Sequence, residues 1–318
     1  MFGLDVSIII VNWNTRDLLE NCLTSVMQQY KNVDFEVIVI DNASTDGSAQ
    51  QVKGRFPKVI LVENRENRGF ATANNQGMKI AKGRYIFLLN SDTVILDRTI
   101  ENMVRFADAH PDTAVVGCKV LNPDGTLQPT CFMFPSLLNI ALLVTYLYKL
   151  FPRSRFFGRE HMTWWDRNDD REVDVVTGCC MLVRREAIQQ VGMMDDRFFM
   201  YAEETDWCYR FRRGGWKNMF TPTARIVHYG NASAVRFGPE RALLRDESDI
   251  KLMFKHWPVW QARVGIVLKI VFYMSRLIVL VPLLFFFRRL KYQKTFHNHW
   301  TGLLGLLSGI SIRSRFDA

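Results

Sequence analysis

Residues 85–93 read YIFLLNSDT, an apolar run that stops abruptly at Asn90, Ser91 and Asp92. Short apolar runs bounded by turn-forming residues are typical of strands that are buried on both faces of a sheet. In a parallel sheet, ligands bind at the edge that the carboxyl ends of the strands form. The stretch therefore predicts a buried strand that presents the carboxylate of Asp92 at a ligand-binding edge.

Apolar runs alternate with helical periodicity on the N-terminal side of this strand. Strands are expected at VSIIIV (6–11), EVIVI (36–40) and VILVE (59–63), and helices between them, including one over residues 70–81 that Gly83 ends. This alternation is typical of βαβ units. The sequence therefore predicts an α/β fold with a mostly parallel central sheet that helices cover on both faces.

Each predicted strand is followed by a cluster of polar residues. The clusters are NWNT (12–15), DNASTDGS (41–48), NRENRGFATANN (64–75) and NSDT (90–93). Any one of them has a structural explanation, because Asn, Asp, Ser and Gly are common in turns and helix caps. Four in succession, each at a strand end, favour a binding site at the carboxyl edge of the sheet.

The sequence also limits how an anionic ligand can be held there. Neither the GxGxxG pattern of dinucleotide-binding folds nor the GxxxxGK[ST] pattern of P-loop proteins occurs in the chain. A hard carboxylate such as Asp92, beside Asn90, can instead hold Mg²⁺ or Mn²⁺, and the metal can bridge a diphosphate.

Composition narrows the class of protein further. The 318 residues are 48% hydrophobic and can bury a full core, and the net charge of +9 favours an anionic partner, whether nucleic acid, a membrane surface or a phosphorylated ligand. The six cysteines form no CxxC pair, which fits a reduced compartment. The first residues lack the features of a secretory signal, so activity is expected on the cytoplasmic side.

The order of the motifs resembles the family 2 inverting glycosyltransferases of the GT-A fold. The resemblance is carried by DNASTDGS (41–48), NRGFATANNQG (67–77), LLNSDT (88–93), FFMYAEETDWCYR (198–210) and ARIVHYGNAS (224–233). LNPDGTLQ (121–128) and the NWN opening are most similar to the rhamnosyltransferase-like enzymes of bacterial surface polysaccharide assembly. The resemblance implies a GT-A type nucleotide-sugar-binding domain over residues 1–260. It would move a sugar, with rhamnose as one candidate, from a dTDP- or UDP-sugar to a lipid-linked saccharide acceptor, without nucleic acid.

The resemblance also assigns donor-side residues. It implies that Asp41 accepts the N3 hydrogen of a uracil or thymine ring, and that Asn12 and Asp46 line the nucleoside. It places Gly69 and Asn74 in the segment that passes close to the donor.

The metal site follows from the same resemblance. Asp92 matches the last acidic residue of the DXD motif, whose first position is Asn90 in this chain. His228 falls where the family has a histidine near the metal or the diphosphate, although a lone histidine in a strand is more often a packed core residue. The implied cofactor is Mg²⁺ or Mn²⁺.

The general base is implied by an acidic pair that opens a helix. Here the pair is Glu203 and Glu204, with Glu204 at the base position and Glu203 as the alternative. Asp206, Thr177 and Gly178 are assigned to the acceptor side. A structural explanation exists as well, because acidic residues in the first turn of a helix interact favourably with its dipole.

Two apolar segments lie outside this machinery. SLLNIALLVTYLYKLF (136–151) fits either a core helix or an interfacial one. Residues 261–318 are expected to form membrane-associated helices that lie on the inner face of the cytoplasmic membrane or re-enter it, with Pro282 favouring a shallow hairpin. The cations expected to meet anionic headgroups are Lys269, Arg276, Arg288, Arg289, Lys291 and Lys294. A soluble helical subdomain is the alternative.

Two other function classes can be compared with a glycosyltransferase. A nucleotidyltransferase that makes nucleotide-sugars would need a glycine-rich loop with a basic residue after the first strand, and NWNT has neither. A noncatalytic, membrane-bound nucleotide-binding scaffold would not need Asp41, Asp92 and Glu204 together.

Overall fold

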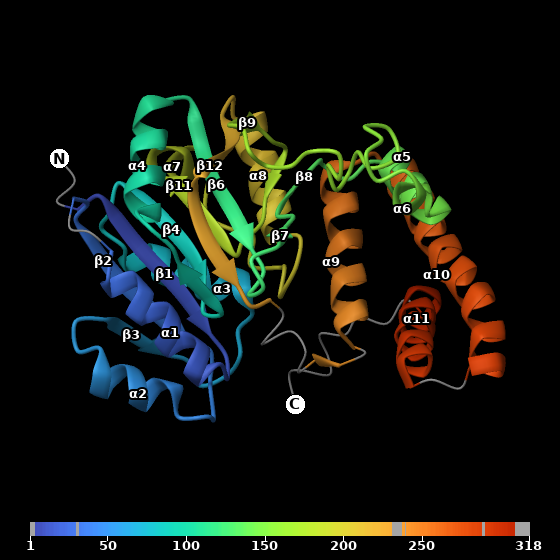
Figure 1. The fold of residues 1–318 in the computed structure, drawn as a ribbon, viewed down its shortest axis with the longest axis horizontal. Coiled ribbons are helices and arrows are strands. Elements are labelled where there is room, and N and C mark those ends of the chain that lie inside the picture. Colours follow the sequence, from blue (N-terminus) through green and yellow to red (C-terminus); the bar gives the residue numbers. More distant parts are fainter. Residues whose placement is uncertain (1–3, 30–31, 231–236, 239, 288–289, 309–318) are drawn as a thin grey trace. The chain divides into compact units, whose positions relative to one another are not determined.

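The computed structural model describes residues 4–29, 32–230, 237–238, 240–287 and 290–308 (Figure 1). The chain divides into two compact units, and each is described by itself. The first unit comprises Met1–Phe134, Trp165–Phe199 and Glu203–Ser233. The second unit comprises Pro135–Trp164, Met200–Ala202 and Ala234–Ala318.

The first unit contains a sheet whose N-terminal strands run parallel in the order β3-β2-β1-β4. These strands are β1 (Val6–Asn12), β2 (Phe35–Asp41), β3 (Ile60–Glu63) and β4 (Tyr85–Asn90). The register pairs Asn12 with Asp41 and Val11 with Asn90, so the carboxyl ends of the strands align. The predicted strands and the largely parallel sheet are confirmed.

The other strands extend the sheet with mixed directions. β11 (Cys180–Arg184) lies antiparallel between β4 and β6 (Thr113–Leu121). β12 (Lys217–His228) runs parallel to β6 and antiparallel to β5 (Thr93–Ile95). The shorter strands are β7 (Leu127–Gln128) beside β6, β9 (Arg171–Glu172) beside β12, and the pair β8 (Cys131–Phe132) and β10 (Val175–Val176). Because His228 pairs with Thr93, the end of β12 lies next to the NSDT cluster.

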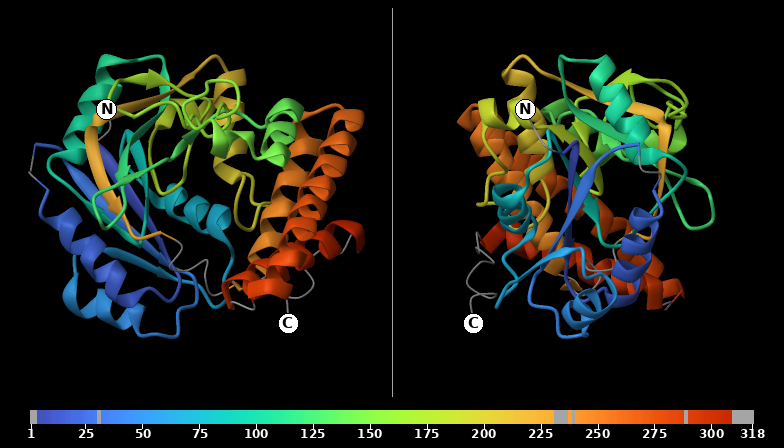
Figure 2. Two further views of the ribbon diagram at one scale, coloured as in Figure 1. Left: turned by 45° about the vertical axis from the view of Figure 1, so that its right-hand side comes forward. Right: turned by 90° about the vertical axis from the view of Figure 1, so that its left-hand side faces the viewer.

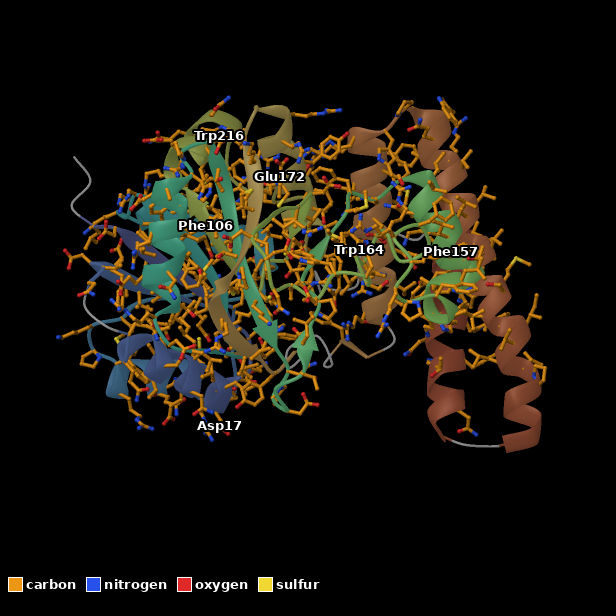
Figure 3. The ribbon with its side chains drawn as sticks, turned by 45° about the horizontal axis from the view of Figure 1, so that its top comes forward. Asp17, Phe106, Phe157, Trp164, Glu172 and Trp216 are labelled. Carbon is orange, nitrogen blue, oxygen red and sulfur yellow. The ribbon has the colours of Figure 1, made fainter. Side chains whose placement is uncertain are left out.

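Helices cover both faces of the sheet (Figure 2). α1 (Arg16–Met27) and α4 (Thr99–Ala109) pack on one face, where Phe106 of α4 lies at the margin of the core (Figure 3). α3 (Phe70–Ile80) covers the other face and confirms the predicted helix. Its Gly77 allows close approach, since a Cβ there would lie 2.6 Å from the side chain of Ile9. α2 (Ser48–Arg55), α7 (Arg185–Val191) and α8 (Glu203–Arg213) also belong to the first unit.

The second unit is built from helices. They are α5 (Leu137–Thr145), α6 (Leu147–Leu150), α9 (Glu240–His256), α10 (Val259–Phe287) and α11 (Leu290–Ser308). Ile140, Met253 and Ala262 form one buried cluster that joins α5, α9 and α10. Tyr273 and Leu303 belong to a second cluster that joins α10 to α11. The segment 136–151 therefore contributes to a core, although its last residues are exposed.

α10 is longer than the sequence pattern suggested. It continues through Pro282 to Phe287, so the proline does not end the helix. α11 packs back against α10, and Gly302 permits this because a Cβ there would lie 2.5 Å from the ring of Tyr273. The stretch Val259–Pro282 is long and apolar enough to cross a membrane by length and composition, and only 22% of that window is buried in the structure.

Two cations of α10 are paired inside the second unit, which corrects the expectation that they meet lipid headgroups. Lys269 Nζ lies 2.6 Å from a carboxylate oxygen of Asp246 and 2.6 Å from one of Asp249, both on α9. The guanidinium of Arg276 donates to the carbonyl oxygens of Leu143 and Val144, at the C-terminal end of α5. Arg288 and Arg289 lie outside the described residues, as do the side chains of Lys291 and Lys294.

Residues 200–202 belong to the second unit, although Glu203 follows them directly in the chain. The Ser248 hydroxyl donates to the Met200 carbonyl oxygen at 2.8 Å, and Arg241 Nε donates to the Tyr201 hydroxyl at 2.8 Å. Tyr201 and Ala202 have φ angles of 72° and 65°, which are costly for residues that carry a Cβ. α9 therefore holds a strained turn just before the acidic pair in the chain.

A group of aromatic side chains follows α6 in the same unit. Phe151 stacks on Phe157 with ring centroids 5.4 Å apart, and the Arg155 guanidinium lies 4.8 Å from the ring centroid of Trp164. Phe157 and Trp164 are labelled in Figure 3. These contacts order a segment that has few regular elements of its own.

Candidate active site

The carboxylate of Asp41 lies at the end of β2 and is held by its neighbours. Asn12 Nδ2 donates to Asp41 Oδ1 at 2.9 Å, and the Ser44 backbone amide donates to Asp41 Oδ2 at 2.9 Å. Thr15 Oγ1 donates to Asn12 Oδ1 at 2.6 Å, which fixes the orientation of the Asn12 amide. A carboxylate has about four lone-pair positions, so Asp41 keeps capacity for one more N–H donor, such as a ring imide.

Asp46, which was predicted to line the nucleoside, joins two loops. Its carboxylate accepts from the backbone amide of Arg16 at 2.8 Å and from that of Ser48 at 3.1 Å. Burial alone would raise the pKa of Asp46, but the hydrogen bonds from the Ser48 hydroxyl and from these amides outweigh it, so the pKa is lowered. In this structure the carboxylate ties the start of α1 to the start of α2.

The segment before α3 approaches another loop closely. Gly69 has a φ of +80°, and a Cβ there would lie 2.4 Å from the carbonyl oxygen of Phe199. The Phe70 amide donates to that same oxygen at 2.8 Å. Asn74, predicted to lie near the donor, is 1% exposed, and its Nδ2 donates to the Phe70 carbonyl oxygen at 3.0 Å. In this structure the Asn74 side chain is therefore bound to the first turn of α3.

The pairing of β5 with β12 brings the predicted metal ligands together. His228 Nε2 lies 3.2 Å from Asp92 Oδ1 and 3.4 Å from Asn90 Nδ2. Asp92 is 6% exposed, and the Tyr229 amide donates to its carbonyl oxygen at 2.9 Å. Residues 136 positions apart in sequence therefore share one end of the sheet.

The donor set at this point fits a divalent cation. A carboxylate oxygen and an imidazole nitrogen lie 3.2 Å apart, and His228 Nδ1 is engaged at 2.6 Å by Gln128 Oε1, which leaves Nε2 facing Asp92. Searched over the described residues alone, the chain has no group of three or more His, Cys, Asp or Glu side chains that could hold a metal. Two protein ligands suit an ion that completes its coordination with substrate phosphates and water.

The two glutamates at the start of α8, Glu203 and Glu204, differ in burial. Glu203 is 4% exposed, and its Oε2 has no hydrogen-bond partner among the residues that the structure describes. Burial, with the neighbouring charge of Glu204 second, raises the pKa of Glu203 well above its usual value. Glu204 is only partly buried. The arrangement favours a protonated Glu203 beside Glu204.

Thr177 and Gly178 lie between β10 and β11, beside both carboxylate groups. A Cβ on Gly178 would lie 3.1 Å from the Phe70 ring and 4.0 Å from the Glu204 Cβ. The next residue, Cys179, accepts a hydrogen bond at its carbonyl oxygen from the Asn90 amide at 3.1 Å. Burial chiefly raises the pKa of the Cys179 thiol to about 12, while a hydrogen bond with Thr177 lowers it and the charges of Asp92 and Glu204 raise it. The charges of Asp92 and Glu204 therefore both act on Cys179.

Asp206 has a structural role in this arrangement. It is fully buried, and its carboxylate pairs with Arg210 one turn later at 2.9 Å. Arg210 also donates to the carbonyl oxygens of Val191 and Met193, at 2.8 Å each. The pair therefore fixes α8 to the loop after α7.

Sequence reasoning missed three polar residues at this edge of the sheet: Thr15, Ser44 and Gln128. Thr15 and Ser44 lie inside clusters that had been noticed, but nothing distinguished them from turn residues. Gln128 ends the LNPDGTLQ motif, which had served only to recognise a subgroup.

Fold and site together define a glycosyltransferase with the GT-A architecture. The mannosyltransferase from Pyrobaculum calidifontis, solved in complex with GDP-Man and Mn²⁺, has a similar fold with a TM-score of 0.57 and 16% identity, over 96% of this chain and 88% of that one. GalNAc-T7, solved with UDP, GalNAc and Mn²⁺, gives a TM-score of 0.54 and 17% identity, over 71% of this chain and 44% of that one. The model of glycosyl transferase family 2 matches residues 7–192, and the chain belongs to that family.

Two relatives are named as glycosyltransferases with diphospho-decaprenol- or diphosphoundecaprenol-linked acceptors. The N-acetylglucosaminyl-diphospho-decaprenol L-rhamnosyltransferase of Mycobacterium tuberculosis is 27% identical over 270 residues, which are 80% of this chain and 86% of that protein. The UDP-Glc:alpha-D-GlcNAc-diphosphoundecaprenol beta-1,3-glucosyltransferase WfaP of Escherichia coli is 37% identical over 105 residues, which are 32% of this chain and 41% of that protein.

Proposed function

We propose that the protein is an inverting, metal-dependent glycosyltransferase that moves a sugar from a dTDP- or UDP-sugar to a lipid-linked saccharide acceptor at the cytoplasmic face of the membrane. Rhamnose is the first candidate sugar, because a relative that is matched over 80% of this chain and 86% of its own length is named a rhamnosyltransferase. The observation that supports the proposal is that the segment Gly178–Cys179 lies close to both acidic sites: a Cβ on Gly178 would lie 4.0 Å from the Glu204 Cβ, and the Cys179 carbonyl oxygen accepts from the amide of Asn90, two residues before Asp92. Glycosyl transfer needs a group that binds the leaving diphosphate and a base for the acceptor hydroxyl, and the two must lie near each other.

The residues present can divide the reaction between them. Asp41 and Asn12 would hold the pyrimidine ring, and Asp92 and His228 would hold Mg²⁺ or Mn²⁺. When bound, the ion supplies charge neutralisation for the leaving nucleoside diphosphate. Glu204 would take the proton of the acceptor hydroxyl. The oxygen of that hydroxyl would bond to the anomeric carbon while the bond from this carbon to the diphosphate breaks. Attack opposite the leaving group inverts the anomeric centre.

The Glu204 assignment has a matched test within the pair. Glu204→Gln should lower kcat about a hundredfold to ten-thousandfold with little change in the donor KM, because a positioned base acts in the transition state. Glu203→Gln should keep most activity, because it replaces a carboxyl group that burial already favours in the neutral form. A large loss in Glu203→Gln with an active Glu204→Gln would exchange the roles.

The donor and the stereochemistry are tested separately. A thermal-shift panel of dTDP- and UDP-sugars, with and without Mn²⁺, reports which donor binds, because a ligand stabilises the folded state by mass action. Asp92→Asn should remove the Mn²⁺-dependent part of that shift. The anomeric configuration of the product, read by NMR coupling constants, decides the mechanism: retention would refute an inverting transfer.

An apolar face of α10 supports the membrane part of the proposal. The side chains at helical spacing on this face, called here the outer stripe, are Trp260, Val264, Val267, Val271, Met274, Ile278 and Val281, each at least 41% exposed. Contiguous exposed apolar surface of this kind marks an interaction site. The opposite side of α10 carries the paired Lys269 and Arg276, so a helix that lies along the bilayer surface suits both faces.

The proposed division of roles keeps the transferase chemistry within residues 1–260 and most of the membrane contact in residues 261–318, with further contacts from residues 153–155 and Trp260 of the second unit. Exposed cations of the second unit, Arg153, Arg155 and Arg263, are candidates for contact with anionic headgroups. In the proposal these three arginines take the place of Lys269 and Arg276 as the side chains that contact headgroups.

Flotation with anionic vesicles tests the membrane contact on the full-length chain. Val267→Asp with Ile278→Asp should leave the protein in the soluble fraction while donor-induced thermal shifts persist. Met27→Asp, at an exposed apolar position on α1, is the matched control and should float like the unsubstituted protein. A full-length protein that does not float would refute membrane association and favour a water-soluble acceptor.

A further inference from the structure

We propose that Gln128 is a positioning residue that keeps the proton of the His228 ring on Nδ1 and so presents the Nε2 lone pair to the metal beside Asp92. The inference rests on the proposed metal-dependent transfer. It assigns a role to the LNPDGTLQ motif, which the site described above leaves without one.

The contact is short and comes from a neighbouring strand. Gln128 Oε1 lies 2.6 Å from His228 Nδ1, and Gln128 Nε2 lies 3.3 Å from the His228 carbonyl oxygen. β7 pairs with β6 at Val120 and Gln128, while β6 pairs with β12 at Val120 and Ile226. The Gln128 side chain therefore forms hydrogen bonds with both the ring and the backbone of His228.

The direction of each hydrogen bond follows from a chain of contacts that begins at a carboxylate. Asp124 Oδ1 can only accept, and it accepts from the Thr126 hydroxyl at 2.6 Å. With its own hydrogen used, Thr126 Oγ1 accepts from Asn122 Nδ2 at 2.9 Å. Asn122 Oδ1 then accepts from Gln128 Nε2 at 2.8 Å. This order fixes the Gln128 amide with its oxygen toward the histidine ring.

The orientation of the amide determines the tautomer of the ring. Because Gln128 Oε1 has no hydrogen to give, the proton between it and His228 must be on Nδ1. In a neutral imidazole the other nitrogen then carries a lone pair, which is the form that binds a metal ion. A partner that fixes the second ring nitrogen of a metal-binding histidine changes metal affinity typically ten- to a hundredfold when it is removed.

Asp124 and Thr126 are exposed and lie in one turn, which anchors the start of the chain of contacts. Gly125 has a φ of +81°, and its amide donates to the Asn122 carbonyl oxygen at 2.9 Å. Hydrogen bonds from Thr126, side chain first and then backbone, lower the pKa of Asp124. The turn therefore keeps an ionised acceptor at the start of the chain of contacts.

The first test reads the tautomer without metal, sugar or acceptor. Long-range ¹H–¹⁵N spectra of the full-length protein labelled with [¹⁵N]histidine distinguish a protonated from an unprotonated ring nitrogen, and His228→Asn identifies the signal. We expect a proton on Nδ1 in the unsubstituted protein. In Gln128→Met, which keeps the length but removes the acceptor, Nδ1 should lose its proton, while Nε2, which lies 3.2 Å from Asp92 Oδ1, should carry one. An unprotonated Nδ1 in the unsubstituted protein would overturn the inference.

The second test measures Mn²⁺ affinity by electron paramagnetic resonance in the presence of UDP or dTDP. Gln128→Met should weaken Mn²⁺ binding about ten- to a hundredfold. Gln128→Glu retains an acceptor for Nδ1 and should restore it, while Gln190→Met, at an exposed glutamine of α7, should leave it unchanged. Melting temperatures of all variants report whether they fold.

Equal Mn²⁺ affinity in Gln128→Met and the unsubstituted protein, or failure of Gln128→Glu to restore it, would overturn the inference. Neither readout uses a sugar donor or an acceptor. A failure here therefore leaves the proposed transfer reaction standing, and a failure of the transfer assays leaves the tautomer measurement standing.

Discussion

For Lys269→Met the sequence and the structure predict different outcomes: the sequence predicts weaker membrane binding, and the structure predicts lower stability. As a cation within an apolar helix, Lys269 was expected to contact lipid headgroups. In the structure its side chain is 15% exposed and lies 2.6 Å from both Asp246 and Asp249, whose side chains are 6% and 33% exposed. Removing the ammonium group therefore leaves a buried carboxylate without its cation.

The cost follows from the burial of Asp246. Breaking a buried ion pair by removing one partner costs about 3–5 kcal/mol, because the remaining charge stays desolvated. A change of that size corresponds to a fall in Tm of roughly 6–20 °C, at about 2–4 °C per kcal/mol for units of this size. Tyr273 still donates to Asp246 at 2.6 Å, which places the expected cost toward the lower end.

Differential scanning calorimetry and vesicle flotation together decide between the two interpretations. Arg153→Met, which removes an exposed cation of the same unit, should change stability by less than about 0.5 kcal/mol. Asp246→Asn added to Lys269→Met should recover part of the loss, because the unpaired charge is removed as well. A Lys269→Met protein with an unchanged Tm and lost flotation would refute the structural reasoning.

Three further predictions concern the first unit. The pKa of Glu203 is raised in the folded state above its ordinary value of 4.5, so its contribution to stability is present below pH 4.5 and is lost as the pH rises through the folded pKa. The Tm of the unsubstituted protein is therefore expected to fall with rising pH, and Glu203→Gln should flatten that fall; an equally steep fall in the variant would contradict this. Gly69→Ala should cost roughly 1–3 kcal/mol in the free energy of unfolding, because its φ of +80° and the nearby Phe199 oxygen both exclude a Cβ, and equal denaturant midpoints would contradict this. Asp46→Ala should cost about 1 kcal/mol through lost contacts to the Arg16 and Ser48 amides while the donor Kd is unchanged, and a weaker donor with intact stability would instead assign Asp46 to the nucleoside.

The local elements of the first hundred residues were predictable because their signals are local. β4 ends at Asn90 as the apolar run does, and α3 covers Phe70–Ile80 as the periodicity predicted. The alignment of Asp41 with Asn12 follows from the register of parallel neighbours, which a βαβ pattern largely fixes.

Contacts between distant segments were not predictable from periodicity. Nothing in the sequence indicates that β11 inserts antiparallel between β4 and β6, or that His228 pairs with Thr93. His228 was assigned by resemblance, and the β5–β12 pairing gives that assignment a geometry. The partners of Lys269 lie on another helix, and helical spacing within α10 carries no information about them.

The turn at residues 200–202 has a consequence for how such enzymes recombine. A gene fusion that replaces everything after residue 233 with the C-terminal part of another transferase would also replace Ser248 and Arg241, the partners of Met200 and Tyr201. The positive φ angles of Tyr201 and Ala202 would then lose the contacts that hold them, one residue before the acidic pair. Functional chimaeras should therefore carry residues 200–202 and α9 from the same parent. The C-terminal helices cannot be exchanged by themselves, because their unit includes residues 200–202, which directly precede the acidic pair in the chain.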